Sequence, residues 1–251
     1  MFKPLWIAIS TYSIFPTPRP NWDERNMRRA LLFLPAVGLL IGGAFLLWTT
    51  LCRALHMDVV LFAAVSTALP LLLTGGMHMD GFMDTVDAIG SRQARERKLE
   101  IMKDSHCGAF AVLYCGIYLL VSFGLYHALY LSAALPAICI GFVLSRTLAV
   151  LCAVTMPNAR GGGLLFTFSE NSRGAGAIAA MCVTGLICLG GMTVVSKAAG
   201  IAVFVAALIA LLIYRRTTLR QFGGATGDTT GFFIQLCELC MLIGAFVGGL
   251  L

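Results

Sequence analysis

Residues 31–51 read LLFLPAVGLLIGGAFLLWTTL, a run of 21 residues without one charged side chain. An α-helix needs about 20 such residues to cross the hydrocarbon core of a bilayer. Because a backbone in lipid must satisfy its own hydrogen bonds, this run predicts a transmembrane helix. Six further apolar runs lie at residues 59–75, 108–131, 133–155, 175–195, 198–214 and 232–251. The sequence therefore predicts an all-α, polytopic membrane bundle of about seven transmembrane helices.

Composition excludes a soluble protein. Of the 251 residues, 59% are apolar and 12% are charged, and the mean hydropathy is +0.87, whereas a soluble domain is about half apolar and a quarter charged. A soluble fold of this length has too small an interior for so much apolar surface. We expect one membrane-embedded domain over residues 1–251, with an interfacial N-terminal segment at 1–30 and a cytoplasmic acidic loop at 76–107.

The positive charges are distributed unevenly around the predicted spans. With the N-terminus inside, fifteen of the 18 Lys and Arg residues fall in inside segments, Arg53 and Lys197 fall outside, and Arg146 lies within a span. Positive residues favour cytoplasmic loops, so we expect a multi-pass protein of the cytoplasmic (inner) membrane with its N-terminus inside. The net charge of +6 then serves topology and contact with anionic lipid. The lipid bilayer is an expected partner, and nucleic acid is not.

An acidic motif follows the second predicted span. Residues 75–87 read GGMHMDGFMDTVD, and in a helix Asp80, Asp84 and Asp87 stand at i, i+4 and i+7, on one face. Three carboxylates on one face repel, so a compensating charge is needed. Mg²⁺ suits this position, because it takes carboxylate oxygens and shares its other positions with substrate phosphates. A solvated acidic helix face is the alternative, and we favour the metal.

Two glycine-rich loops are predicted on the same side of the membrane. Residues 158–163 carry Arg160, and residues 223–231 carry Asp228 just before the last span. Backbone N–H groups in such loops and at helix N-termini favour anions, so both loops are candidates for phosphate binding. Alternatively they are plain turns, with Asp228 capping the last helix.

Five more charged side chains are candidates for the site. Glu100 and Asp104 stand four residues apart beside Lys103. Arg146 and Glu238 lie within predicted spans, where ionisable groups are costly and face a cavity or a partner. The two are also candidates to pair with each other.

Several separated motifs resemble those of the adenosylcobinamide-GDP ribazoletransferase (cobalamin synthase) family, over almost the whole chain. The most specific is residues 74–87, similar to the family's GG-x-H-x-DG-x-x-DT-x-D. The others are Pro35-x-x-Gly38, residues 99–105, Ser145-Arg146, Ala159-Arg160 with its glycines, and Gly224-x-Thr226-Gly227-Asp228-Thr229. The sequence departs from the family pattern at His106, Leu165 and Gln235.

The resemblance implies an Mg²⁺-dependent enzyme of cobalamin biosynthesis. Its substrates would be adenosylcobinamide-GDP and alpha-ribazole or the 5′-phosphate of alpha-ribazole, and its products GMP and adenosylcobalamin or its phosphate. We assign the metal to Asp80, Asp84 and Asp87. The candidate bases are Asp104, Glu100 and His78. The candidate substrate contacts are Lys103, Arg146, Arg160 and Asp228.

Two other functions remain as alternatives. The acidic motif is also similar to that of CDP-alcohol phosphotransferases, which displace CMP from a pyrophosphate in a membrane. A transporter is less favoured, because transporters bind their substrates near the bilayer midplane, whereas this acidic motif lies beside a predicted loop. The sequence leaves open a homo-oligomer and an assembly with other enzymes of the pathway.

Overall fold

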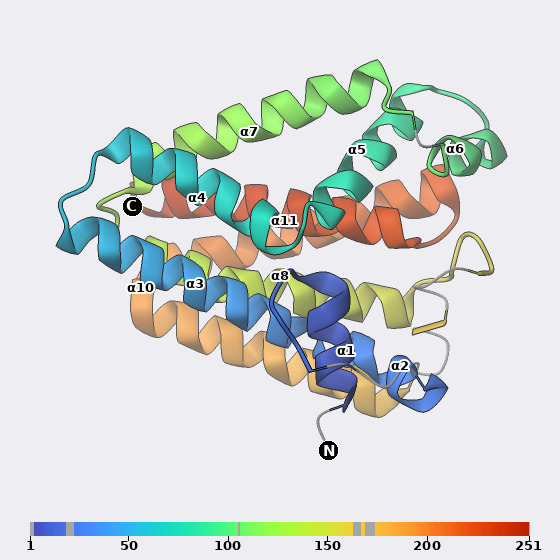
Figure 1. Ribbon diagram of the computed structural model, residues 1–251, viewed down its shortest axis with the longest axis horizontal. Helices are drawn as coiled ribbons and strands as arrows, with labels where there is room; N and C mark the ends of the chain where they lie inside the picture. The colour runs from blue at the N-terminus through green and yellow to red at the C-terminus, as the bar shows by residue number, and fades with distance from the viewer. Residues whose placement is uncertain (1–2, 19–22, 105, 163–166, 169–173, 251) are drawn as a thin grey trace.

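The computed structural model describes residues 3–18, 23–104, 106–162, 167–168 and 174–250, and in these ranges it is a bundle of α-helices (Figure 1). Leu165 therefore lies outside the described residues. The elements are α1 (Lys3–Tyr12), α2 (Glu24–Ala30), the 3-10 turn η1 (Leu31–Phe33), α3 (Leu34–Ala54), α4 (Val59–Leu73), α5 (Met77–Gly90), α6 (Arg95–Ile101), α7 (Ala109–Leu129), α8 (Leu135–Thr155), α10 (Ala175–Phe222) and α11 (Gly227–Gly248).

The described helices agree with about seven spans. Five of them are long and apolar enough to cross a membrane, and α4 with α5 makes a sixth candidate that is bent by 92°. α10 consists of two helices joined at Lys197, whose φ of 46° and ψ of −125° are not helical. The chain reverses direction there (Figure 1). Counting the two halves of α10 separately gives the seven predicted segments.

α8 is the central helix of the bundle. It packs against α3, α10 and α11, and 78% of its most apolar stretch is buried inside the bundle. Glycines let α3 approach it closely, since a Cβ on Gly38 or Gly42 would lie 2.3 Å from the carbonyl oxygen of Phe142 or Cys139. Small residues at helix contacts are typical of membrane bundles. Large apolar side chains of α3, α7 and α10 remain exposed on the outside, as expected of surfaces that face lipid.

The segment at 76–107, predicted as a loop, is mostly helical. Gly75 and Gly76 take left-handed φ values of 63° and 77°, a conformation that glycine adopts without a steric penalty. These two residues produce the sharp bend after α4, and the chain then continues as α5 and α6. The prediction of a loop was wrong because the bend between two helices was taken for the end of regular structure.

The two ends of the bundle differ in character. The turns after α3 and α7 and the C-terminus lie at one end (Figure 1). The other end carries α2, α6, the described segment that follows α8 and the turn that precedes α11 (Figure 1). At this second end α1 packs against α2 and α3, and the N–H of Ile14 donates to the carbonyl of Leu73 at 2.9 Å. The N-terminal segment thus becomes part of the same end as the acidic motif.

Candidate active site

Glycines bring α5 and α11 into backbone contact. A Cβ on Gly81 would lie 2.7 Å from the carbonyl oxygen of Asp228, and one on Gly231 would lie 3.0 Å from that of His78. No larger residue fits at Gly81 unless the helices separate. This contact places the acidic motif of α5 beside the first turn of α11.

The two glycine-rich loops meet at the same place. The N–H of Ala159 donates to the carbonyl of Ala225 at 3.0 Å, and the N–H of Ala225 donates to that of Pro157 at 2.8 Å. Asn158 Oδ1 accepts from the N–H groups of Arg160 and Gly161 at 2.9 and 2.8 Å. The loop thereby holds Arg160 Nη2 at 2.9 Å from Asp228 Oδ2, an ion pair.

α11 begins at this site with a capping box. Thr226 is the N-cap: its side chain accepts from the N–H of Thr229 at 3.1 Å, and the Thr229 hydroxyl accepts from the N–H of Thr226 at 2.8 Å. Asp228 therefore lies in the first turn, and the alternative in which it caps the helix is wrong. The N-terminus of a long helix favours an anion here.

These elements enclose a pocket of about 300 Å³. Its polar lining residues are Asp80, Asp228, Arg160, His78, Thr226 and Thr230, and its apolar and aromatic lining residues include Tyr12, Leu31, Leu34 and Ile234. The ring of Tyr12 stacks on that of His78, with centroids 6.3 Å apart. No sequence pattern singled out Tyr12 as a site residue, because a tyrosine in an apolar helix is common in any fold. Thr226 and Thr230 belong to the segment at 223–231, which the sequence predicts as a phosphate-binding candidate.

The three aspartates of α5 share one face but differ in environment. Asp80 is exposed and lines the pocket. Asp84 is half-buried, and it interacts electrostatically with Asp80, Asp228, Arg160 and Asp87. The carboxylate of Asp87 packs against Gly108, where a Cβ would lie 2.1 Å from its oxygens. Asp87 thus faces the start of α7.

Within the described residues, no group of three His, Cys, Asp or Glu side chains is placed to hold a metal. The predicted three-aspartate cluster is therefore not assembled. Asp80 and Asp228 instead face one pocket. This donor set fits Mg²⁺, because the ion is commonly held by one or two carboxylates together with substrate phosphates.

Among the three candidate bases, the structure brings only His78 to the pocket. It is 4% exposed, and its Nε2 has no hydrogen-bond partner among the described residues. Glu100 pairs with Arg97 at 2.8 Å on an exposed surface. Asp104 is also exposed, and a hydrogen bond from His106 lowers the pKa of its carboxyl group. Lys103 is exposed and lies outside the pocket lining as well.

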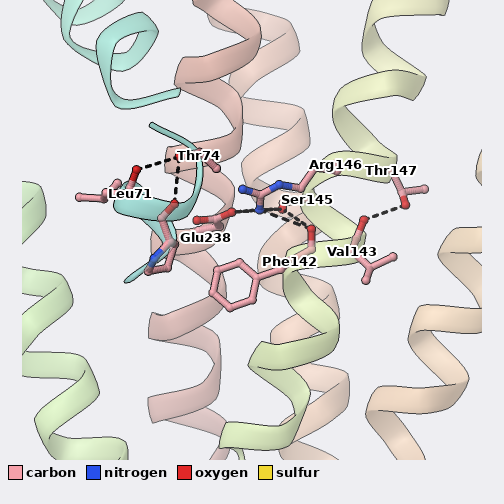
Figure 2. A network of polar contacts seen from close by, with 9 residues as sticks. Leu71, Thr74, Phe142, Val143, Ser145, Arg146, Thr147 and Glu238 are labelled. Carbon is pink, nitrogen blue, oxygen red and sulfur yellow. Dashed lines mark hydrogen bonds and ion pairs between the residues drawn. The ribbon is translucent and has the colours of Figure 1, made fainter. Parts of the chain in front are cut away.

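Arg146 and Glu238 form the predicted ion pair, between α8 and α11 (Figure 2). Arg146 is fully buried and Glu238 is 6% exposed. Arg146 Nη1 donates to Glu238 Oε1, to Ser145 Oγ at 3.0 Å and to the carbonyl of Phe142 at 3.4 Å. Neither charged side chain lines the pocket, so this pair ties two spans together beneath the site.

Known proteins resemble the chain along nearly its whole length. The family model described as cobalamin-5-phosphate synthase matches residues 4–246. An adenosylcobinamide-GDP ribazoletransferase of Lachnoclostridium phytofermentans is 40% identical, with 94% of this chain and 90% of the relative covered. One of Desulfitobacterium hafniense is 39% identical, with 97% and 96% covered. No solved structure gives a significant match. The chain therefore belongs to the cobalamin-5-phosphate synthase family.

Proposed function

We propose that the protein is a transferase that completes the assembly of cobalamin. It transfers the adenosylcobinamide-phosphate moiety of adenosylcobinamide-GDP to alpha-ribazole or to the 5′-phosphate of alpha-ribazole, and GMP leaves. The family and the names of its relatives support this reaction. The observation that carries the proposal is the meeting of Asp80, Asp228 and Arg160 in one pocket at the N-terminus of α11.

The pocket suits a pyrophosphate. Arg160 and the first turn of α11 supply positive charge for its oxygens, while Asp80 and Asp228 are the ligands we propose for Mg²⁺, with Asp84 beside them. When bound, the ion would neutralise the pyrophosphate and stabilise the leaving GMP. We propose that Tyr12 and the apolar lining residues limit the access of bulk water to the reacting phosphorus.

In the reaction, the hydroxyl oxygen of the ribazole forms a bond to the phosphorus next to cobinamide. The bond from that phosphorus to the bridging oxygen breaks, and this oxygen leaves with GMP. His78 is the base that we favour for the hydroxyl proton, because it lies in the pocket with Nε2 free of a described partner. Glu100 and Asp104 are exposed and are paired instead with Arg97 and His106.

We propose that the pocket opens to the cytoplasm from the inner membrane. The end of the bundle that carries the pocket also carries α2, α6 and the loop with Arg160 (Figure 1). Most Lys and Arg residues between the spans fall at this end, which supports the orientation by the positive-inside rule.

The test is product analysis with detergent-purified protein, adenosylcobinamide-GDP, alpha-ribazole and Mg²⁺. We expect equal amounts of GMP and of the joined corrinoid, and neither product when Mg²⁺ is chelated. Folded protein that forms neither product would overturn the proposal. Release of CMP from a CDP-alcohol under the same conditions would favour the phosphotransferase alternative.

A further inference from the structure

A second hollow of about 500 Å³ lies between α5, α7 and α11. Its lining is apolar and aromatic, apart from one arginine. Its lining residues include Phe82, Val86, Ile89, Arg92, Tyr114, Ile117 and Phe232. We call this hollow the α7 groove.

The α7 groove is separate from the candidate active site. Phe82, Val86 and Ile89 project from the side of α5 opposite to Asp80 and Asp84, because successive helical residues are rotated by about 100°. The ring of Phe82 stacks on that of Phe232 at 5.6 Å. This aromatic contact joins α5 to α11, and the groove shares no lining residue with the pocket of the candidate active site.

The groove is open toward the outside of the bundle. Tyr114 and Ile117 of α7 are each 45% exposed. Of the five single-helix candidate spans, α7 is the least buried, with 22% of its most apolar stretch inside the bundle. The groove lies along the half of α7 that follows Gly108, next to the pocket-bearing end. In a bilayer such an apolar opening faces acyl chains of that leaflet, with aromatic rings near the interface.

Arg92 is the charged side chain among the lining residues of the groove. It follows α5 with a left-handed φ of 53°, a conformation that is unfavourable for residues other than glycine. Its side chain is exposed and makes no ion pair or hydrogen bond within the described ranges. A single unpaired cation at the end of an apolar, aromatic groove matches an anionic headgroup joined to an acyl chain.

We infer that the α7 groove binds one anionic phospholipid of the surrounding bilayer. The headgroup phosphate lies at Arg92, and an acyl chain lies between α7 and α11. A free phosphate leaves the apolar lining unfilled, and a zwitterionic lipid such as phosphatidylcholine places its own cationic group beside the phosphate that would pair with the arginine. The lipid holds α7 against α5 and α11 at a point where protein side chains leave a gap.

Two single-tryptophan additions test this site in vesicles of phosphatidylcholine and phosphatidylglycerol. Ile117→Trp places a fluorophore in the groove, and Leu120→Trp places one on the 74% exposed outer face of the same helix. Each is read against the parent chain, while one lipid at a time carries brominated acyl chains that quench tryptophan on contact. Size-exclusion chromatography checks that each variant is folded.

We expect brominated phosphatidylglycerol to quench the residue 117 probe about fivefold more effectively per mole than brominated phosphatidylcholine, the preference that one basic residue confers. Arg92→Gln should abolish this preference, and the probe at 120 should show none. Equal quenching by both lipids at 117, or a preference that survives Arg92→Gln, would overturn the inference. Protection of the 117 probe by alpha-ribazole would also overturn it and assign the groove to the acceptor substrate.

Discussion

The buried carboxylate of Glu238 and the carboxylates of the candidate active site have opposite surroundings. Glu238 lies between α8 and α11 with Arg146 and Ser145 as partners. At the candidate active site, Asp80 and Asp228 line the pocket, Asp84 lies within reach of their charges, and Arg160 pairs with Asp228. A buried carboxylate that is paired with its own counter-charge is neutralised within the fold, whereas several carboxylates around one cation favour the binding of a further cation. The comparison separates a structural ion pair from a site prepared for metal and phosphate.

Glu238→Gln should give the largest effect of the four changes, and this effect is a loss of stability. It leaves Arg146 buried without its anion, a loss of about 3–5 kcal/mol in the free energy of unfolding. Denaturant titration in detergent measures this loss. The double variant Arg146→Met/Glu238→Leu removes both charges and should recover most of the stability. Recovery of none of it would show that the pair contributes more than mutual neutralisation.

Asp80→Asn should act on the reaction and leave the fold intact. We expect GMP release to fall about 10²–10³-fold, as when one group that stabilises transition-state charge is lost. Stability should be unchanged or higher, because repulsion among the pocket carboxylates is relieved. Glu100→Gln, at an exposed acid outside the pocket, is the matched control. An equal loss of activity in both variants would contradict a specific role of Asp80 in the pocket.

The contact between α5 and α11 gives a third prediction. Gly81→Ala forces a methyl group to 2.7 Å from a backbone oxygen, and overpacking of this kind costs about 1–3 kcal/mol of stability. GMP release should fall as well, because Asp80 moves away from Asp228. Gly116→Ala, in α7 with open space around the added methyl, should be neutral. A stable and fully active Gly81→Ala would show that the two helices separate without consequence.

The exposed pair Asp104–His106 should give the smallest effect. Its hydrogen bond lowers the pKa of Asp104 and raises that of His106, so the pair exists only between these two values. It weakens as pH rises through the raised pKa of His106, and as pH falls through the lowered pKa of Asp104. NMR titration should show the pKa of His106 returning toward 6.5 in Asp104→Asn. GMP release should change less than about twofold, and a large loss would restore Asp104 as a catalytic base.

The spans could be predicted from the sequence because an uncharged apolar run of bilayer length is typical of a transmembrane helix. Arg160, Asp80 and Asp228 could be predicted as candidate residues, since charged side chains between spans are conspicuous, and the structure places all three in one pocket. The role of Tyr12 could not, because it depends on α1 packing against α3. The contact of Asp87 with Gly108 could not be predicted either. Helical spacing tells which face of α5 carries Asp87, but it does not tell which other element packs there. The close approach at Gly81 and Gly231 could not be predicted, because it depends on the contact between α5 and α11.

Direct measurement of metal binding tests the central contrast between the two carboxylate groups. Mn²⁺, in place of Mg²⁺, is titrated into protein with adenosylcobinamide-GDP, and the electron paramagnetic resonance signal of the free ion reports binding. We expect one tightly bound ion in the unmodified protein and in Glu100→Gln, and at least about tenfold weaker binding in Asp80→Asn. Equal binding in all three proteins, or none in the unmodified protein, would contradict the assignment of the pocket carboxylates to a metal.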